Sequence, residues 1–418
     1  MKYSELFPKS RKIEFKDDLS INAKLLTKAG FIDQLMAGSY TLLPLGFRIV
    51  EKIKNIIREE LNKTGAQELS MPLLHPKEIW DQTGRWSDPD VKKIMYQFKD
   101  IHDKEYGLSF THEEIVLDLL RKLTQSYKDF PVKVYQFSTK FRNEPRAKSG
   151  ILRGREFLMK DLYSAHVSKE DFDKYYNQVK EAYIKIFKRI GLTVIVTEAG
   201  GGVFTKNITH EFQVLSDIGE DEIIYCTGGD FAQNAEIAKV SEGKECDLGH
   251  GPLKRVKTIE VGNIFSFGQD YSKKMNVTFV DKNGDRQYPY FGSYGIGPTR
   301  TMGTVVEVYH DEKGLRWPKS VAPYEVHLVH IEDPGTEGTV KSLYDKLRKA
   351  GIEVLWDYRE DVSAGEKLNV ADLIGIPVRL VVSAKTGGKV EWKKRSGKET
   401  ELLNAQEVIS RTAEEKES

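Results

Sequence analysis

The clearest pattern along the chain is a set of helical apolar stripes separated by extended runs. In 46–63, apolar residues recur every three to four positions, which predicts a helix that ends before Gly65. A second helix is predicted over 168–190, with Ser168 as its N-cap and Gly191 just after its last residue. Hairpin-like runs lie between the long helices, so we expect an antiparallel sheet with flanking helices in this front part.

The pattern changes after a proline-containing segment at 318–323, where short apolar runs alternate with helical stripes. Strands are predicted at 326–331, 352–356 and 378–382, and helices at 339–349 and 367–373. This alternation is typical of a small α/β unit with a mostly parallel sheet. We therefore expect a multidomain chain of α+β and α/β parts, with domains 1–318 and 319–418.

Two predicted strands with polar side chains are joined by the basic loop 145–154. In 132–144, aromatic and polar residues alternate, which places Arg142 and Glu144 on one face. On the second strand, five residues share a face: Arg155, Phe157, Met159, Asp161 and Tyr163. Arginine grips phosphate and phenylalanine stacks on a base, so the set fits an anionic, aromatic ligand. The alternative is an ordinary half-solvated hairpin.

An aromatic extended run over 288–294 leads into a glycine-rich turn and a helix. Gly295 and Gly297 precede Pro298, a residue suited to the first position of a helix, and Arg300 falls in the first turn. A helix start of this kind exposes backbone N–H groups that suit phosphate. The spacing matches neither a dinucleotide fingerprint nor a P-loop. Purely structural glycines are the alternative.

Thr111 and Glu113 lie two residues apart in the run Thr-His-Glu-Glu. On a strand they would share a face and could hold an ammonium or imino group. Thr111 with Glu114 also matches a helix capping box, which is the simpler interpretation.

Composition limits the function classes. The net charge is +1, with −3 after residue 324 (15 Lys and Arg against 18 Asp and Glu) and +4 before it, so neither part binds nucleic acid by bulk charge. The lysines and arginine at 385–398 form a local basic patch or a solvated hairpin. No apolar run long enough to span a membrane and no targeting segment is recognised, so a cytoplasmic protein is expected. Two cysteines, Cys226 and Cys246, predict reduced thiols and no structural zinc, although His250 lies nearby.

Taken together, three segments resemble the class II aminoacyl-tRNA synthetases, and in detail the bacterial-type prolyl-tRNA synthetases. They are FRNE (141–144), RGREFLMKD (153–161) and YGIGPTR (294–300). The resemblance covers nearly the whole chain, with family motifs expected at about 46–72, 136–163 and 288–309. It implies a homodimer built around the first motif, and ATP with Mg²⁺, L-proline and tRNA(Pro) as substrates and partners. It also implies a C-terminal anticodon-binding domain and passage through a prolyl-adenylate.

The resemblance assigns roles residue by residue. Arg142 is expected at the ATP α-phosphate and the proline carboxylate, Glu144 and Phe157 at the adenine, and Arg153 and Arg300 at the outer phosphates. Glu211 and Gln213 are candidate ATP or magnesium contacts. The proline pocket is assigned to Thr111, Glu113, Arg142, Met159, Asp161, Tyr163 and His210. Asp357, Arg359 and Glu360 are candidate anticodon readers.

The largest departure from the family is a missing segment. Many bacterial relatives carry an editing domain between the second and third motifs, whereas here about 40 residues separate 219–221 from 261–265. The resemblance therefore implies a short form that does not edit Ala-tRNA(Pro) in cis. Smaller departures are Phe110 before Thr111, the run at 203–208, Asn263 and Ser293. Another class IIa synthetase, or a non-catalytic paralogue, is the alternative.

Overall fold

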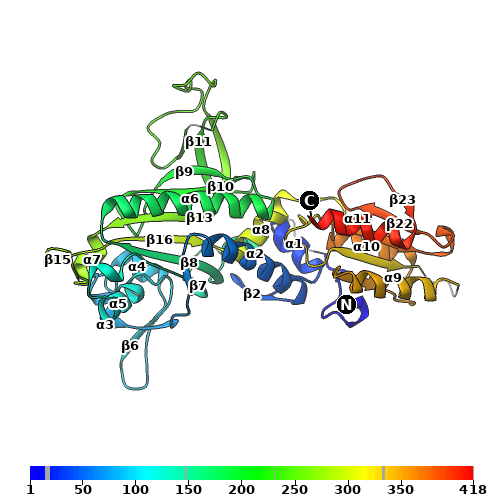
Figure 1. Ribbon diagram of the computed structural model, residues 1–418, viewed down its shortest axis with the longest axis horizontal. Helices are drawn as coiled ribbons and strands as arrows, with labels where there is room; N and C mark the ends of the chain where they lie inside the picture. Colours follow the sequence, from blue (N-terminus) through cyan, green and yellow to red (C-terminus); the bar gives the residue numbers. More distant parts are fainter. Residues whose placement is uncertain (15–18, 146, 148, 230, 332–334, 418) are drawn as a thin grey trace. The chain divides into compact units, whose positions relative to one another are not determined.

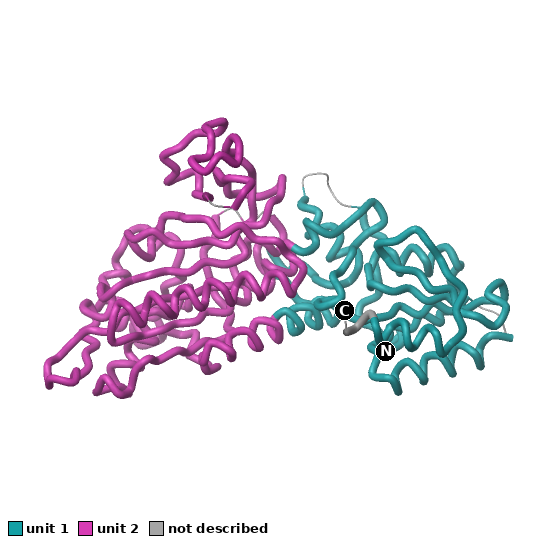
Figure 2. The backbone as a smooth tube through the Cα atoms, turned by 45° about the horizontal axis from the view of Figure 1, so that its top comes forward, with its two compact units in different colours: residues 1–36, 40–53, 305–418 teal, residues 37–39, 54–304 magenta. Residues whose placement is uncertain are grey.

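The computed structural model describes residues 1–14, 19–145, 147, 149–229, 231–331 and 335–417. The backbone divides into two compact units, coloured separately in Figure 2. One unit contains residues 37–39 and 54–304, and the other contains residues 1–36, 40–53 and 305–418. Each unit is assembled from segments distant in sequence, and the domain boundary at 318/319 stays a prediction. Within the described ranges, no helix is both long and apolar enough to cross a membrane.

The unit around 54–304 is built on a nine-stranded sheet (Figure 1). The strand order is β10-β9-β12-β11-β13-β16-β8-β7-β3, and β10 also pairs with β13. All neighbours are antiparallel except β12–β9 and β3–β7, so the predicted antiparallel sheet is confirmed. The strands are β3 Gln67–Glu68, β7 Val132–Phe141, β8 Glu156–His166, β9 Ile195–Gly200, β10 Ile208–Leu215, β11 Asp221–Tyr225, β12 Ala232–Asn234, β13 Lys254–Gly268 and β16 Tyr290–Ile296.

Helix α6 (Lys169–Ile190) packs along this sheet (Figure 1). Ser168 caps it, because the Ser168 hydroxyl accepts a hydrogen bond from the backbone N–H of Asp171 at 3.2 Å. Gly191 ends it with φ 100°, in the left-handed region that glycine adopts without strain. One side of the helix is fully buried, including Tyr183 and Phe187, so the helix predicted at 168–190 is confirmed.

Smaller elements complete this unit. They are the three-stranded sheet β4 Leu74–Pro76, β5 Gln97–Lys99 and β6 Glu105–Leu108, the hairpin β14 Phe279–Val280 and β15 Arg286–Gln287, the helices α3 Lys77–Asp81, α4 Pro89–Ile94, α5 Glu113–Leu123 and α7 Asp270–Lys274, and the 3-10 turns η2 Tyr127–Asp129 and η3 Gly150–Leu152. Two further helices, α2 (Pro44–Asn62) and α8 (Pro298–Val308), have residues in both units. Both were predicted from their apolar stripes and are confirmed.

The second unit contains a five-stranded sheet in the order β20-β19-β21-β22-β23. Its elements are η1 Tyr3–Glu5, α1 Ile21–Lys28, β1 Ile32–Met36, β2 Ser39–Leu42, β17 His310–Asp311, β18 Gly314–Leu315, β19 Val326–His330, α9 Glu337–Lys349, β20 Val354–Asp357, α10 Ala364–Ile374, β21 Val378–Val382, η4 Ala384–Thr386, β22 Val390–Lys394, β23 Glu401–Leu403 and α11 Ala405–Glu417. Strand β19 is parallel to β20 and β21, as predicted, but β22 and β23 are antiparallel. The short connection from β21 to β22 explains this, because parallel neighbours require a long crossover.

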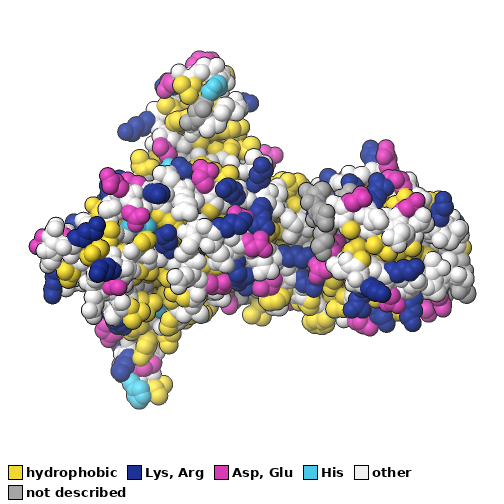
Figure 3. Space-filling model, viewed as in Figure 1, with side chains coloured by type: hydrophobic (Ala, Val, Ile, Leu, Met, Phe, Trp, Pro, Cys, Tyr) yellow, Lys and Arg dark blue, Asp and Glu magenta, His cyan; other side chains and the backbone are white. Residues whose placement is uncertain are grey.

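Charges of both signs are interspersed over the face of the molecule shown in Figure 3. The predicted basic patch at 385–398 is only partly available. Arg395 belongs to the interior, because its side chain is 6% exposed and its guanidinium bonds both oxygens of Asp311, at 2.6 and 2.7 Å. Lys385, Lys389 and Lys398 are exposed. Two cations of the predicted basic loop, Arg146 and Lys148, lie outside the described residues.

Candidate active site

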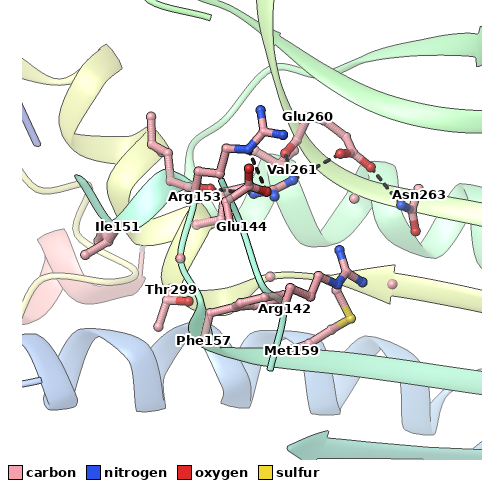
Figure 4. Close-up of a pocket in the computed structure, with 16 residues that line it drawn as sticks. Arg142, Glu144, Ile151, Arg153, Phe157, Met159, Glu260, Val261, Asn263 and Thr299 are labelled. Carbon is pink, nitrogen blue, oxygen red and sulfur yellow. Dashed lines mark hydrogen bonds and ion pairs between the residues drawn. The ribbon is translucent and has the colours of Figure 1, made fainter. Parts of the chain in front are cut away.

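A pocket of about 570 Å³ lies where β7, β8, β13 and β16 meet the start of α8 (Figure 4). The predicted residues that line it are Arg142, Glu144, Arg153, Phe157, Met159 and Arg300. An adjoining hollow shares both Arg142 and Arg300 and extends to residues 218–221. The fold therefore brings the two predicted phosphate arginines, from distant parts of the sequence, to one place.

Arg142 follows directly after β7, and its backbone N–H donates to the carbonyl of Arg155 at 2.8 Å. Its guanidinium carbon lies 5.3 Å from the centre of the Phe157 ring, and one terminal nitrogen donates to the carbonyl of Phe110 at 3.4 Å. The Nε atom is buried without a hydrogen-bond partner among the described residues. Burial, followed by the charge of Arg300, lowers the pKa of Arg142. A half-buried cation with so few acceptors favours the binding of an anion.

Arg300 reaches the same pocket from the first turn of α8. Its Nε donates to the carbonyl of Leu152 at 2.9 Å, and one terminal nitrogen lies 3.0 Å from the Glu260 carboxylate. Asn263 donates to the other oxygen of Glu260 at 2.7 Å. The strand, glycine turn and helix predicted around Pro298 are confirmed. Unlike Arg142, Arg300 already has a carboxylate partner.

Glu144 and Arg153 form an ion pair on the rim of the pocket. The Nε atom of Arg153 lies 2.9 Å from the Glu144 carboxylate, and a second guanidinium nitrogen contacts Glu220. Although burial opposes it, these two carboxylates hold the pKa of Arg153 above its ordinary value. Glu220 was not predicted as a site residue. Its position directly before β11 is what places it beside Arg153.

Three carboxyl groups gather on the neighbouring strands β10, β11 and β13. Burial, followed by the charge of Glu260, raises the pKa of Glu211 to about 8, and the same two causes raise the pKa of Asp221 to about 6. Gln213 donates to Glu211 at 2.8 Å, so these two predicted residues lie together. Sequence reasoning missed Glu260 and Asp221, because only strand pairing brings them near Glu211.

A buried polar network lies between β7 and β8 and is centred on Asp161. The Asp161 carboxylate lies 2.8 Å from the ammonium of Lys140 and accepts from the Gln136 amide at 2.9 Å and the Tyr163 hydroxyl at 3.0 Å. Lys140 is 0% exposed and Gln136 is 1% exposed. The interpretation of this hairpin as half solvated is therefore wrong for its central part, where Gln136, Lys140 and Asp161 form an interior network, whereas residues 141–144 and 156–159 stay partly exposed.

The pair of Thr111 and Glu113 is held together at the start of α5. The Thr111 hydroxyl donates to the Glu113 carboxylate at 2.6 Å, and the His112 backbone N–H donates to the Tyr163 hydroxyl at 3.0 Å. The predicted capping box is wrong, because His112 occupies the N-cap and Glu114 instead faces Arg85 at 3.1 Å. Arg85 also lies 3.3 Å from Glu113, and sequence reasoning did not identify it.

His210 is not brought together with the other predicted proline residues. It is adjacent to Glu211 on β10, so the two side chains point to opposite faces. The ring of His210 lies against α6, where its Nδ1 is 2.8 Å from the Tyr176 hydroxyl. Glu211 is on the face that carries Glu260.

Comparisons with known proteins agree with this geometry. Residues 96–309 match the family of the tRNA synthetase class II core domain (G, H, P, S and T), and residues 325–415 match the anticodon binding domain family. The chain is 36% identical to a proline–tRNA ligase of Agrobacterium fabrum, over 98% of this chain and 99% of the relative. The chain belongs to the proline–tRNA ligase family. It is also 38% identical to the enzyme of a Wolbachia strain from Drosophila simulans, over 92% of each chain.

The predicted fold class is confirmed for this proline–tRNA ligase family member. A solved prolyl-tRNA synthetase of Cryptosporidium parvum, in complex with halofuginone and AMPPNP, superposes with a TM-score of 0.79 at 20% identity. It covers 95% of this chain and 76% of that one. The likeness shows the shared fold of a class II core and a C-terminal anticodon-binding domain.

The predicted anticodon readers of this family member differ sharply in exposure. Asp357 is fully buried and forms a two-bond ion pair with Arg359, at 2.9 and 2.8 Å. The guanidinium of Arg359 also lies 4.5 Å from the centre of the Tyr3 ring. Glu360 is exposed. Of the three, Glu360 alone presents an exposed side chain.

Proposed function

We propose that this chain joins L-proline to tRNA(Pro) with ATP in two steps. Proline first forms a prolyl-adenylate and releases pyrophosphate, and a ribose hydroxyl at the 3′ end of the tRNA then takes the prolyl group and releases AMP. Membership of the proline–tRNA ligase family supports the substrates. The observation that carries the proposal is Arg142, a half-buried cation whose buried Nε has no partner among the described residues, beside Phe157 and near Arg300.

ATP is placed across the pocket by its aromatic and basic side chains. The ring of Phe157 stacks on the adenine, with Glu144 near the base edge. Arg142 holds the α-phosphate and the proline carboxylate, because its free Nε and terminal nitrogens can donate to both. Arg153 and Arg300 reach the outer phosphates. Each has a carboxylate partner in the ligand-free chain, which the phosphates replace or share.

The carboxyl groups of Glu211, Asp221 and Glu260 fit a magnesium ion that accompanies ATP. Magnesium prefers oxygen ligands and phosphate oxygens, and the raised pKa values of Glu211 and Asp221 show that negative charge here lacks compensation. The ion would supply positive charge to the pyrophosphate leaving group. Arg300, 3.0 Å from the Glu260 carboxylate, neutralises part of this charge within the chain.

Proline is placed next to Arg142 and Met159, the two predicted proline-binding residues that line the pocket. Its imino group donates to Thr111 and Glu113, whose side chains already share a hydrogen bond, and Arg85 fixes the Glu113 carboxylate from behind. Met159, Asp161 and Tyr163 shape the walls. The proline carboxylate is ionised at neutral pH, so it attacks the α-phosphorus without a general base. The residues therefore act by positioning and by neutralising charge.

The tRNA and a second copy of the chain complete the proposal. The 325–415 domain binds the anticodon, where the exposed Glu360 can reach base edges while Asp357 and Arg359 hold the loop. The segment 46–72 forms the homodimer interface, a proposal that rests on the resemblance. In this element Phe47 is 54% exposed, unlike the buried apolar residues that follow it. Light scattering at micromolar concentration should give twice the mass of the chain, and a single chain mass would contradict dimerisation.

ATP–pyrophosphate exchange with each of the twenty amino acids tests the activity directly. We expect strong exchange with proline and weaker exchange with alanine, which is smaller and fits the same pocket. Exchange with another amino acid but not with proline would assign a different synthetase. No exchange with any of them would indicate a non-catalytic member.

We further propose that this chain does not clear Ala-tRNA(Pro) in cis. A relative from Dehalococcoides mccartyi aligns with 98% of this chain over 561 positions, so well over a hundred positions of the relative have no counterpart in these 418 residues. Between β11 and β13 the chain has only residues 226–253. Preformed Ala-tRNA(Pro) should be hydrolysed at the background rate when the protein is added, and faster hydrolysis would refute the proposal.

A further inference from the structure

The excursion between β11 and β13, residues 226–253, contains three side chains that the proposed reaction does not use. It projects beyond the end of β11 in Figure 1 and contains β12 as its only regular strand among the described residues. Cys226, Cys246 and His250 meet here, and their ligand atoms all lie within 4.8 Å of one another. The Sγ of Cys226 is 3.7 Å from the Nδ1 of His250.

The sulfur-to-nitrogen distance between Cys226 and His250 is close to that of a tetrahedral zinc site. With Zn–S bonds of about 2.3 Å and Zn–N bonds of about 2.0 Å, a sulfur and a nitrogen bound to one ion are about 3.6 Å apart. Two thiolates with one imidazole favour zinc over harder cations such as magnesium. Both cysteines are free thiols, and both are buried, at 2% and 7% exposure. The distance between Cys226 and His250 thus suits a shared metal ion, and the third ligand atom lies within 4.8 Å of both.

Two tight turns hold the sulfur atoms toward each other. After Cys226, the N–H of Gly229 donates to the Cys226 carbonyl at 3.0 Å, and the N–H of Gly228 lies 3.3 Å from the Cys226 sulfur. After Cys246, the N–H of Gly249 donates to the Cys246 carbonyl at 2.8 Å. A backbone N–H directed at a sulfur stabilises a thiolate and orients it as a ligand.

The imidazole of His250 packs directly against the turn that follows Cys226. A Cβ atom added to Gly228 would lie 2.4 Å from Nδ1 of His250 and 2.6 Å from its Cγ. No residue other than glycine therefore leaves room for the ring at this place. The close approach keeps His250 beside the thiols although the residue itself is exposed.

The excursion also has too small an apolar core to fix its own conformation. Its buried cluster consists of Ile224, Cys226, Cys246 and Leu253, with Phe231, Ala238 and Val240 only partly buried against it. Small modules with so little apolar burial generally need a metal or a disulfide. Here two of the four buried members of the cluster are themselves thiols.

We propose that Cys226, Cys246 and His250 bind one zinc ion, with a solvent molecule as the fourth ligand. Binding releases the two thiol protons to solvent and leaves two thiolates and a neutral imidazole on the metal. The ion joins the end of β11 to the segment that leads into β13, and so supports the strands that carry Asp221 and Glu260. The sequence-based prediction of no structural zinc rested on the lack of a four-ligand set; the fold brings three ligands together, and solvent takes the fourth position.

Metal analysis of the full-length protein tests the proposal. Protein purified under reducing conditions and reconstituted with excess zinc should retain about one zinc per chain after desalting. Cys226→Ser, Cys246→Ser and His250→Ala should each weaken zinc affinity more than about 100-fold in a competition titration with a chromogenic chelator. His102→Ala removes an exposed histidine elsewhere in the same unit and should bind zinc like the wild type.

Cobalt supplies a second readout that does not depend on enzyme activity. Cobalt-loaded wild-type protein should show thiolate-to-metal charge transfer in the near ultraviolet, and Cys226→Ser should lose much of it. Wild-type protein that retains no zinc after reconstitution would overturn the proposal. A Cys226–Cys246 disulfide in the intact mass of protein purified without reductant, together with no zinc uptake after reduction, would also overturn it.

Discussion

Arg142 in the pocket and Arg359 in the C-terminal unit are both poorly exposed arginines that the sequence assigned to ligand binding, yet their surroundings differ. Arg359 gives two hydrogen bonds to the buried carboxylate of Asp357, which raises the pKa of its guanidinium. Arg142 has one weak bond to a carbonyl and an unpartnered Nε, and its pKa is lowered. The charge of Arg359 is paired directly with a carboxylate, whereas the charge of Arg142 is compensated only in part, by carboxylates that it does not bond.

This difference separates structural arginines from ligand-binding ones. A buried charge without a partner is costly, and a fold retains it where a ligand of opposite charge will balance it. A buried ion pair, by contrast, becomes costly only when one partner is removed. Substitutions should therefore affect activity at Arg142 and stability at Asp357.

The largest effect is expected for Arg142→Ala. Loss of the group that neutralises the α-phosphate should lower proline-dependent ATP–pyrophosphate exchange by about 10³-fold, near the upper end of values for one preorganised donor. The free energy of unfolding should change little, because Arg142 makes one weak side-chain hydrogen bond and the folded chain lowers its pKa. Exchange kinetics and urea unfolding measure the two effects. Arg286→Ala, at an exposed arginine of β15, is the matched control and should keep full activity. Exchange within tenfold of wild type in Arg142→Ala would contradict the assignment.

The next effect is expected for Asp357→Ala, which removes the carboxylate bonded to Arg359 and leaves the more distant one of Glu366, at 4.0 Å. The stability of the C-terminal unit should fall by about 3 kcal/mol, as for other broken buried pairs. Proline-dependent exchange, which does not require tRNA, should change little. Asp361→Ala, four residues along and exposed, is the control and should unfold like the wild type. Equal unfolding midpoints for Asp357→Ala and wild type would show that the pair is not structural.

A smaller effect concerns the carboxyl group of Glu211. An unfolded glutamate loses its proton near pH 4.3, whereas Glu211 in the folded chain keeps it until about pH 8. Between these two pKa values the folded state keeps a proton on Glu211 that the unfolded state has lost. The free energy of unfolding should therefore fall as the pH rises from 5 to 8. Glu211→Gln should reduce this fall by about 1 kcal/mol or more, without abolishing the part due to Asp221. Thermal unfolding across that range measures it.

A control variant and the addition of magnesium test the Glu211 prediction further. Glu181→Gln, at an exposed position of α6, is the control and should retain the pH dependence of the wild type. Addition of magnesium should also reduce the fall in the wild type, since the ion compensates the charge that burial penalises. If stability between pH 5 and 8 were the same in wild type and Glu211→Gln, the raised pKa would not be coupled to folding.

The sequence was sufficient where local pattern decides structure. The helix at 168–190 was predicted to within a residue, because Ser168 and Gly191 mark its ends chemically and its apolar stripe fixes its buried face. The glycine turn before Pro298 was predicted for the same reason. The assignment of Arg142 and Arg300 to the same site came from the family resemblance, because no local sequence pattern connects residues so far apart.

The site features that the sequence did not predict depend on tertiary contacts. The capping box at Thr111 fails because Arg85, from a separate helix-loop segment, draws Glu114 into an ion pair. Glu260 and Glu220 become site residues through strand pairing and loop position, which no single segment reveals. The placement of His210 could have been corrected from sequence, because it adjoins Glu211 on a strand and neighbours cannot share a face.

The smallest effect is expected for Glu360→Ala, which tests whether the exposed member of the predicted anticodon set contacts RNA. Its side chain is on the surface, so stability should change by less than about 0.5 kcal/mol. Loss of one base contact should raise the KM for tRNA(Pro) by about fivefold or more, equivalent to about 1 kcal/mol, and leave proline exchange unchanged. Glu312→Ala, exposed in the same unit but outside the 325–415 domain, controls for loss of surface charge. An unchanged KM for Glu360→Ala would mean that none of the three predicted residues contacts the anticodon bases, because Asp357 and Arg359 already bond each other.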